Sequence, residues 1–307
     1  MNERHDTARL PRRKPGERFL PAGVSSLVEV DVAAVSHPGR VRQNNEDHFI
    51  ASRFERAMET LASNLPEGEI PARYSETVYG YLVADGVGGT RGGEVASRTA
   101  TETLMELVLE TPDWIMRLDD PLADEVLQRM EGRFQKIREV LRERAAADPS
   151  LLGMATTLTV ACTLGAELMT AHVGDSRAYL RRAKGALVRL TRDQTMAQSL
   201  ADAGAITAEE AARHPGRHVL TGALAIRGAF AQVELKRTRL EDGDQLLLCS
   251  DGLTEMVSEE AIERVLARAA PSARACQELV DLALEAGGKD NVTVVLGRYR
   301  IPATVSA

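Results

Sequence analysis

Four apolar, strand-like runs lie between residues 156 and 191, with very little chain between them. In order they read TTLTVACTL, ELMTAHVGDS, RAYLRR and ALVRLT. The links at Gly165-Ala166 and Lys184-Gly185 are too short for a crossover helix, so the strands that they join must be antiparallel. The chain also lacks the regular alternation of strands and helices that a doubly wound parallel sheet needs.

Further strands and helices are predicted on both sides of this group. Apolar and alternating runs predict strands at 27–36, 78–85, 231–240, 244–251 and 291–300. Helical spacing of apolar residues or helix-prone composition predicts helices at 93–108, 126–141, 192–213, 258–269 and 272–286. We expect 231–240 and 244–251 to pair as a hairpin across Glu241-Asp242-Gly243. The combination indicates an α+β fold with two face-to-face antiparallel β-sheets flanked by helices.

No repeat and no linker to a second domain interrupts the pattern, so we expect one domain over residues 27–300. The basic segment 1–26 is expected to be a disordered arm, and residues 301–307 a short tail. Pro and Gly in residues 51–77 indicate a surface insertion, with a short helix near 54–63.

Composition argues against several classes of protein. The 307 residues carry a formal net charge of -7 and only 4% aromatic residues, which disfavours binding to nucleic acid. Three cysteines without a CxxC pattern indicate a reducing compartment. No stretch reaches the roughly 18 apolar residues of a membrane span, and the N-terminus lacks the apolar core of a signal peptide. We therefore expect a cytoplasmic protein without a membrane span.

Four aspartates occupy the same kind of position, where an apolar strand meets a turn. They are Asp85 before Gly86, Asp175 after Gly174, Asp251 before Gly252, and Asp290 at the start of the last strand. A single acid in such a place is commonly a helix cap or a turn residue. Four of them, together with the triplet Asn45-Glu46-Asp47, favour a shared role.

Clustered carboxylates in a partly buried site cannot all stay ionised unless cations neutralise them. Oxygen ligands suit Mg²⁺ or Mn²⁺ better than zinc. The glycines after Asp85 would let a main-chain carbonyl, that of Gly86, approach a metal without obstruction by a side chain. We therefore expect Asp85 to bridge two metal ions.

Other motifs that a glycine-rich loop could represent lack a required residue at the required position. A dinucleotide fingerprint starting at Gly86 needs glycine where Arg91 stands, and a P-loop needs lysine where Glu94 stands. The sequence has no EF-hand spacing and no Cys/His zinc motif. The triplet at 242–244, DGD, is interpreted as a turn.

Seven motifs together resemble one family. They are RQNNED, ADGVGGTRGGEVAS, ATTLTVA, AHVGDSRAYL, LTRDQT, LLLCSDGLTEMVSEEAI and GGKDNVTVVL, in this order, within residues 28–299. The chain resembles the metal-dependent serine/threonine protein phosphatases of type 2C (PPM), in their bacterial form. The resemblance implies an α/β/β/α sandwich with a mobile flap, which corresponds here to residues 192–228.

The resemblance also implies a role for each matching residue. It implies two Mn²⁺ or Mg²⁺ ions, with a weaker third. The implied ligands and helpers are Asp85, the Gly86 carbonyl, Asp251 and Asp290 for the two ions, Glu46 and Asp47 largely through water, Asp175 with Asp251 for the third ion, Arg42 for the substrate phosphate, and Asn291 in support of the Asp290 loop.

The implied activity is that of a protein-serine/threonine phosphatase, a phosphoric monoester hydrolase. Phosphoserine and phosphothreonine in proteins would be hydrolysed by in-line attack of a metal-bridging hydroxide. A cognate serine/threonine kinase is implied as a partner. Two alternatives stay open: a phosphatase-like regulatory module with weak turnover, and a partner-switch phosphatase that acts on an anti-sigma antagonist.

Three positions depart from the family pattern. Val87 stands where many eukaryotic members carry a histidine proposed as general acid. Asp193-Gln194-Thr195 stands where bacterial members often have the triplet Asp-His-Ser, and Gly222 stands where they often have arginine. The last two changes flank the flap, so they put its part in substrate selection in doubt.

Overall fold

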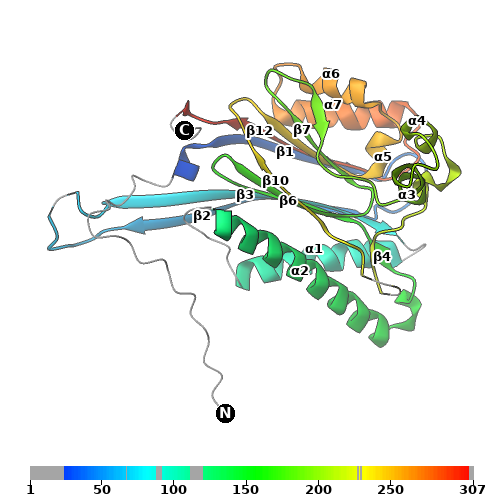
Figure 1. Ribbon diagram of the computed structural model, residues 1–307, viewed down its shortest axis with the longest axis horizontal. Helices are drawn as coiled ribbons and strands as arrows, with labels where there is room; N and C mark the ends of the chain where they lie inside the picture. Colours follow the sequence, from blue (N-terminus) through cyan, green and yellow to red (C-terminus); the bar gives the residue numbers. More distant parts are fainter. Residues whose placement is uncertain are drawn as a thin grey trace, which may run out of the picture.

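The computed structural model describes residues 24–303, except 67, 88–91, 111–119, 227 and 229. Most of the expected arm at 1–26 and of the tail at 301–307 lies outside these residues. Within them, two antiparallel sheets face each other and helices cover both outer faces (Figure 1). The predicted fold class is confirmed.

The first sheet has five strands in the order β1-β12-β11-β7-β8. Their bounds are β1 Glu29–His37, β7 Arg177–Arg181, β8 Leu187–Arg189, β11 Gln245–Cys249 and β12 Val292–Arg300. As the short link around Gly185 predicts, β7 pairs with β8 in antiparallel fashion.

The second sheet has the order β10-β6-β5-β3-β4-β9, with β2 paired to β3. Its strands are β2 Asp47–Glu59, β3 Arg73–Val87, β4 Ala155–Thr156, β5 Leu158–Leu164, β6 Glu167–Val173, β9 Leu224–Ala225 and β10 Glu234–Arg239. The expected antiparallel pairing across Gly165-Ala166 is present between β5 and β6.

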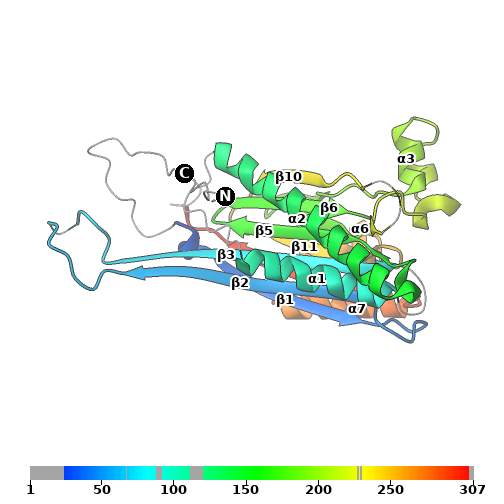
Figure 2. The ribbon, with the colours of Figure 1, turned by 90° about the horizontal axis from the view of Figure 1, so that it is seen from below.

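Each outer face of the sandwich carries its own helices. The long helices α1 (Gly92–Glu110) and α2 (Asp120–Ala147) lie along the second sheet, as the view from below makes clear (Figure 2). The helices α6 (Glu259–Leu266) and α7 (Ser272–Glu285) lie on the first sheet, beside the short helix α5 (Asp251–Thr254). Residues 192–228, which the resemblance predicts to be the flap and which keep that name below, hold α3 (Met196–Asp202), α4 (Ala208–Ala211) and the 3-10 helix η3 (Pro215–His218).

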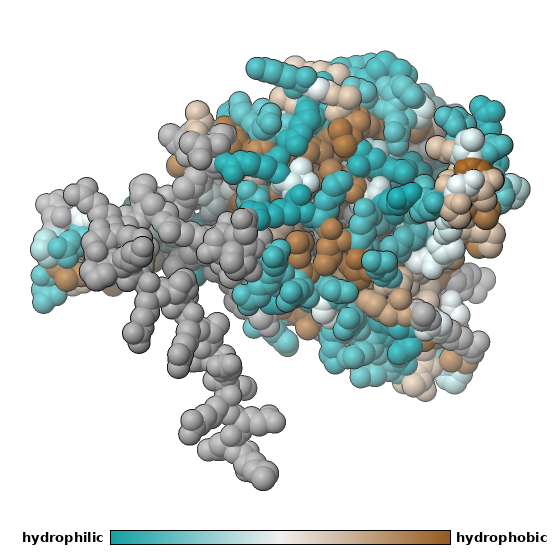
Figure 3. Space-filling model, viewed as in Figure 1, coloured by the Kyte–Doolittle hydropathy of each residue, from teal (hydrophilic) through white to brown (hydrophobic). Residues whose placement is uncertain are grey.

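Three apolar layers hold the sandwich together. One lies between α1, α2 and the second sheet, and includes the predicted helical stripe from Val126 to Leu141. The middle layer joins the two sheets and includes Tyr81 and Tyr299. The third packs α6 and α7 on the first sheet. On the outside, hydrophilic residues cover much of the face seen in Figure 3, with hydrophobic ones showing near its middle.

Two local predictions were wrong. The strands β10 and β11 do not form a hairpin, because β10 pairs with β6 while β11 pairs with β7 and β12 in the other sheet. The turn at Glu241-Asp242-Gly243 therefore crosses from one sheet to the other. The short helix near 54–63 is also absent from the described residues, since β2 continues to Glu59 and pairs with β3 down to Arg73. The segment 51–77 is thus the outer part of a long hairpin, which projects beyond the body (Figure 1).

Candidate metal centre

One edge of the sandwich collects the acids that the sequence placed at strand ends. Asp47 begins β2 and lies directly opposite Asp85 near the end of β3. Asp175 follows the end of β6, Asp251 follows β11, and Asp290 precedes β12. Because neighbouring strands are antiparallel, the ends of β3, β6 and β11 and the starts of β2 and β12 meet at the same edge.

Neighbouring charges raise the pKa of several of these acids. Burial raises the pKa of Asp85 well above its ordinary value, and the charges of Asp47, Asp251, Asp175 and Asp290 raise it further. Burial likewise raises the pKa of Asp251, with Asp175 next among the causes. Burial and then the charge of Asp193 raise the pKa of Asp175 to about 7. Such mutual repulsion favours a site that a cation neutralises.

Asp47 carries a separate sign that an ion fits here. Its Oδ2 atom accepts hydrogen bonds from the hydroxyls of Ser250 and Thr293, both at 2.7 Å. Its Oδ1 atom is buried and has no hydrogen-bond partner. A buried carboxylate oxygen without a partner costs free energy that a cation, or water bound to one, would recover.

Two glycines let oxygen atoms converge beside Asp85. A Cβ atom on Gly93 would lie 2.3 Å from Glu46 Oε2 and 2.7 Å from the Gly86 carbonyl oxygen. A Cβ atom on Gly86 would lie 2.2 Å from the Gly93 carbonyl oxygen. The Glu46 carboxylate and the Gly86 carbonyl therefore both border the space that a side chain at residue 93 would fill, and a side chain at residue 86 would displace the Gly93 backbone. This all-oxygen donor set suits Mg²⁺ or Mn²⁺.

Asn291 holds the loop that precedes β2. Its side-chain amide donates to the carbonyls of Pro38 at 3.0 Å and Asn44 at 2.8 Å, and its Oδ1 accepts from the Glu46 amide at 2.8 Å. The expected support of the Asp290 loop comes instead from the Asn291 backbone N–H, which donates to Asp290 Oδ1 at 2.8 Å. Asn291 thus fixes the backbone of Glu46 relative to β12.

Arg42 lies on the same loop and reaches the acids. Its Nη2 atom donates to Asp290 Oδ2 at 2.6 Å, while more than half of its side chain stays exposed. A guanidinium has five N–H groups, so this bond leaves donors for a phosphate. The residue expected to bind phosphate therefore lies beside a residue expected to bind metal.

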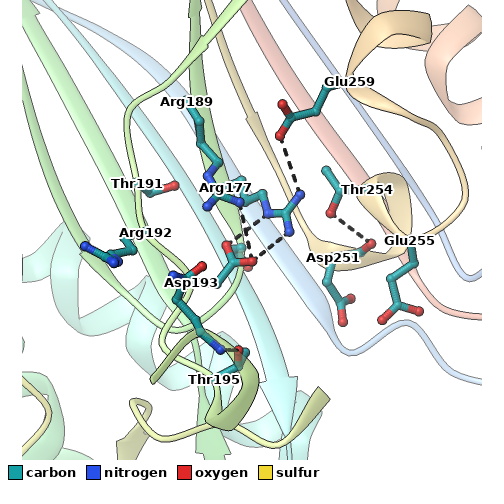
Figure 4. Close-up of polar contacts among 12 residues, drawn as sticks. Arg177, Arg189, Thr191, Arg192, Asp193, Thr195, Asp251, Thr254, Glu255 and Glu259 are labelled. Atoms are coloured by element: carbon teal, nitrogen blue, oxygen red, sulfur yellow. Dashed lines mark hydrogen bonds and ion pairs between the residues drawn. The ribbon is translucent and has the colours of Figure 1, made fainter. Parts of the chain in front are cut away.

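The sequence reasoning missed two residues at this edge. Among the described residues, His218, Asp251 and Glu255 form a group whose ligand atoms all lie within 4.8 Å of one another; Asp85 and Asp290 are not part of it. The carboxylates of Asp251 and Glu255 lie next to each other (Figure 4). Glu255 could have been found, because it follows Asp251 by four residues, the spacing of neighbours on a helix. His218 gives no such signal, since its contact with α5 is distant in sequence.

Comparison with known proteins identifies the family. The family profile described as Protein phosphatase 2C matches residues 72–285. The chain belongs to the protein phosphatase 2C family. This confirms the resemblance of the seven motifs.

Similar phosphatases of this family come from bacteria. The chain is 36% identical over 239 residues to the serine/threonine protein phosphatase PstP of Mycobacterium tuberculosis, covering 76% of this chain and 44% of PstP. It thus spans less than half the length of that relative. It is 30% identical over 275 residues to the protein phosphatase PhpP of Streptococcus pneumoniae, covering 87% of this chain and 96% of PhpP.

A solved structure agrees with the fold. The crystal structure of the PstP catalytic domain in complex with two manganese ions matches with a TM-score of 0.69 at 32% identity, covering 89% of this chain and 99% of that chain. Manganese ions in that relative agree with the oxygen donors found here. Within the described ranges, none of the helices combines the length and hydropathy needed to cross a bilayer.

In this member of the 2C family, an ion pair anchors the start of the flap. Arg177 donates to both carboxylate oxygens of Asp193, at 2.9 Å and 2.6 Å, and both side chains are largely buried (Figure 4). The hydroxyl of Tyr179 accepts from Arg177 and donates to Glu259 at 2.9 Å. Bidentate pairing of this kind fixes orientation. It ties the first residues of the flap to β7, two residues after Asp175.

The two departures from the 2C pattern in the flap fit each other. A Cβ atom on Gly222 would lie 1.8 Å from Gln194 Oε1, so the Gln194 side chain occupies the space beside Gly222. The same Oε1 accepts from the Gly174 amide at 3.2 Å, and Nε2 donates to the Gln232 carbonyl at 2.8 Å. The backbone carbonyl of Gln194 accepts from Thr221 N–H at 2.8 Å. Gln194 therefore joins both ends of the flap to the turn that carries Asp175.

Proposed function

We propose that the protein is a metal-dependent phosphatase that hydrolyses phosphoserine and phosphothreonine in proteins. One observation carries the proposal: carboxylates from separate strands meet at one edge, raise one another's pKa, and leave a buried oxygen of Asp47 without a partner. Family membership and the manganese-bound relative support the same chemistry.

The acids of this edge would take three roles toward the ions. Asp85, the Gly86 carbonyl, Asp251 and Asp290 would hold two Mn²⁺ or Mg²⁺ ions, with Asp85 between them. Glu46 and Asp47 would act largely through water, and Asp175 with Asp251 would hold a weaker third ion. Divalent ions of this kind lower the pKa of bound water toward neutrality and neutralise charge on a phosphoryl group.

The chain's own residues orient the substrate. Arg42 is exposed at the rim, so its guanidinium can hold two phosphoryl oxygens and direct the phosphorus toward the acids for in-line attack. Its bond to Asp290 and the bonds of Asn291 fix where that guanidinium lies. Val87 has no proton to give, and its side chain is partly exposed, so the departing serine or threonine oxygen takes its proton from water.

The proposal is tested with a phosphothreonine peptide and the purified protein. We expect hydrolysis with Mn²⁺, loss of hydrolysis in EDTA, and recovery when Mn²⁺ is returned. An EDTA-insensitive rate would refute the metal mechanism. Binding of the phosphopeptide without turnover in Mn²⁺ or Mg²⁺ would instead favour the phosphatase-like regulatory module. A cognate kinase and an anti-sigma antagonist as substrate remain predictions from the resemblance, and a cytoplasmic location remains a prediction from the composition of the sequence.

A further inference from the structure

The flap brings a histidine to the edge of the acidic site. His218 ends the 3-10 helix η3, and its Nδ1 atom contacts Glu255 Oε1. The ligand atoms of His218, Asp251 and Glu255 lie within 4.8 Å of one another. Two of these residues come from the core, on and just after α5, and one comes from the flap.

The chemistry of the three side chains selects a class of ion. One imidazole nitrogen and two carboxylate oxygens suit Zn²⁺ and, through the carboxylates, Mn²⁺, whereas Mg²⁺ prefers oxygen ligands alone and keeps its water. Three protein ligands also leave positions for water. A protonated His218 could alternatively form a simple ion pair with Glu255, and such a pair would need no metal.

We infer that His218, Asp251 and Glu255 form a transition-metal site that ties the flap to the catalytic core. The site differs from the expected third-ion pair, Asp175 with Asp251, by a nitrogen ligand from the flap. It rests on the proposed function only in sharing Asp251 with that metal centre. An ion held here fixes η3 against α5, and so fixes the position of the flap beside the substrate.

Nitrogen ligation is the most direct signature of this site. Among the ligands named for the metal centre, only His218 offers nitrogen, so pulsed EPR of the Mn²⁺-loaded protein should detect ¹⁴N coupling. His218→Asn should abolish that coupling and weaken binding of one Mn²⁺ by at least about tenfold.

His214 supplies a matched control four residues earlier in the flap. Its Nδ1 atom accepts from the Gly216 amide at 2.9 Å, a role that asparagine can keep. His214→Asn should therefore retain the ¹⁴N coupling. Absence of coupling in the wild type, or its persistence in His218→Asn, would overturn the inference.

Protease protection gives a second readout that needs no turnover. Arg213 and Arg217 are exposed in the flap and are potential trypsin sites. Cleavage after Arg217 should be at least about tenfold slower in Mn²⁺ than in Mg²⁺ for the wild type, but equal in both for His218→Asn. Equal cleavage of the wild type in both ions would show that no metal ion holds η3 against α5.

Failure of this inference can be told apart from failure of the proposed function. An enzyme that is EDTA-sensitive yet lacks ¹⁴N coupling refutes only this inference, whereas a protein that binds no Mn²⁺ refutes the proposed function as well.

Discussion

At the scale of single residues, the acids of the metal centre oppose folding and favour metal binding. Burial and the charges of neighbouring acids raise the pKa of Asp85 and of Asp251. Burial and the charges of Asp193 and Glu255 raise the pKa of Asp175. Ionised neighbours in a partly buried place destabilise the folded chain, and a divalent ion reverses that effect. The same residues should therefore have opposite effects on stability and on activity.

Replacing Asp85 by Asn separates these two effects. We expect phosphatase activity to fall about a thousandfold or more, because several kcal/mol of transition-state stabilisation are lost. The melting temperature in EDTA should stay equal or rise, since one repelling charge is removed. Asp124→Asn, at an exposed position on α2, is the control and should change neither quantity. A variant that melts lower in EDTA than the wild type would argue for a structural role of Asp85.

The pH dependence of the metal-free protein follows from the same pKa directions. The pKa of Asp175 is raised to about 7 in the folded state, whereas an unfolded aspartate titrates near pH 4. The folded chain therefore binds protons that the unfolded chain does not, and stability falls as pH rises through the folded pKa. The buried His172, with its pKa lowered to about 4, acts in the opposite direction only below about pH 6.5.

In EDTA the melting temperature should accordingly rise from pH 8 to pH 7, by about one degree through Asp175 and by more through Asp85 and Asp251, whose pKa values are raised well above the ordinary value. Saturating Mn²⁺ should remove or reverse this trend, because the ions bind ionised carboxylates. Differential scanning fluorimetry at both pH values measures the effect. A flat or falling melting temperature from pH 8 to pH 7 in EDTA would mean that the acids do not repel one another.

At the scale of elements, the two ends of the flap are held together where the Gln194 side chain packs against Gly222. Gly222→Ala places a methyl group against the Gln194 amide and should cost about 1–3 kcal/mol of unfolding free energy. In a Gln194→Ala background that space is open, so the same change should cost much less, with a coupling of about 0.5–3 kcal/mol. Urea unfolding of the wild type, the two single variants and the double variant gives the free energies for this double-mutant cycle. Equal costs in both backgrounds would show that Gln194 and Gly222 do not interact.

The elements also show how far the sequence alone could go. Short links such as Gly165-Ala166 predicted antiparallel neighbours correctly, because link length limits geometry directly. The pairing of β10 with β11 was predicted wrongly, because local pattern does not say which of two stacked sheets receives a strand. The charged run in 53–59 resembles a helix in composition, yet pairing with β3 along its whole length overrides that preference.

The residues of the candidate site also fall into those that the sequence could reveal and those that it could not. The four aspartates at strand ends were recognisable because each lies within two residues of a glycine and at one end of an apolar run. The sequence could not reveal the place of His218 or the packing of Gln194 beside Gly222, because both depend on contacts between segments distant in sequence.

At the scale of the whole molecule, the middle apolar layer sets how closely the two sheets approach. Gly297 in β12 faces Tyr81 in β3, and a Cβ atom there would lie 2.7 Å from the Tyr81 hydroxyl. That hydroxyl also accepts a hydrogen bond from Tyr299 at 3.0 Å. The metal centre lies at the edge of this sandwich, so the spacing of the sheets also sets the spacing of its acids.

Gly297→Ala should therefore destabilise the protein by about 1–3 kcal/mol through overpacking between the sheets. Gly132→Ala is the matched control, because a Cβ atom there meets nothing within 4 Å and alanine favours the helix α2 by about 1 kcal/mol. Urea denaturation measures both. A Gly297→Ala protein as stable as the control would show that the sheets can separate without cost.

The central claim is that strand-end aspartates from both sheets hold divalent ions together. An anomalous difference map from crystals grown with Mn²⁺, recorded near the manganese edge, tests it most directly. We predict two peaks enclosed by Asp85, Asp251 and Asp290, with the Gly86 carbonyl beside one of them. A map without peaks among these residues, from protein that hydrolyses phosphopeptides in the same buffer, would contradict the account.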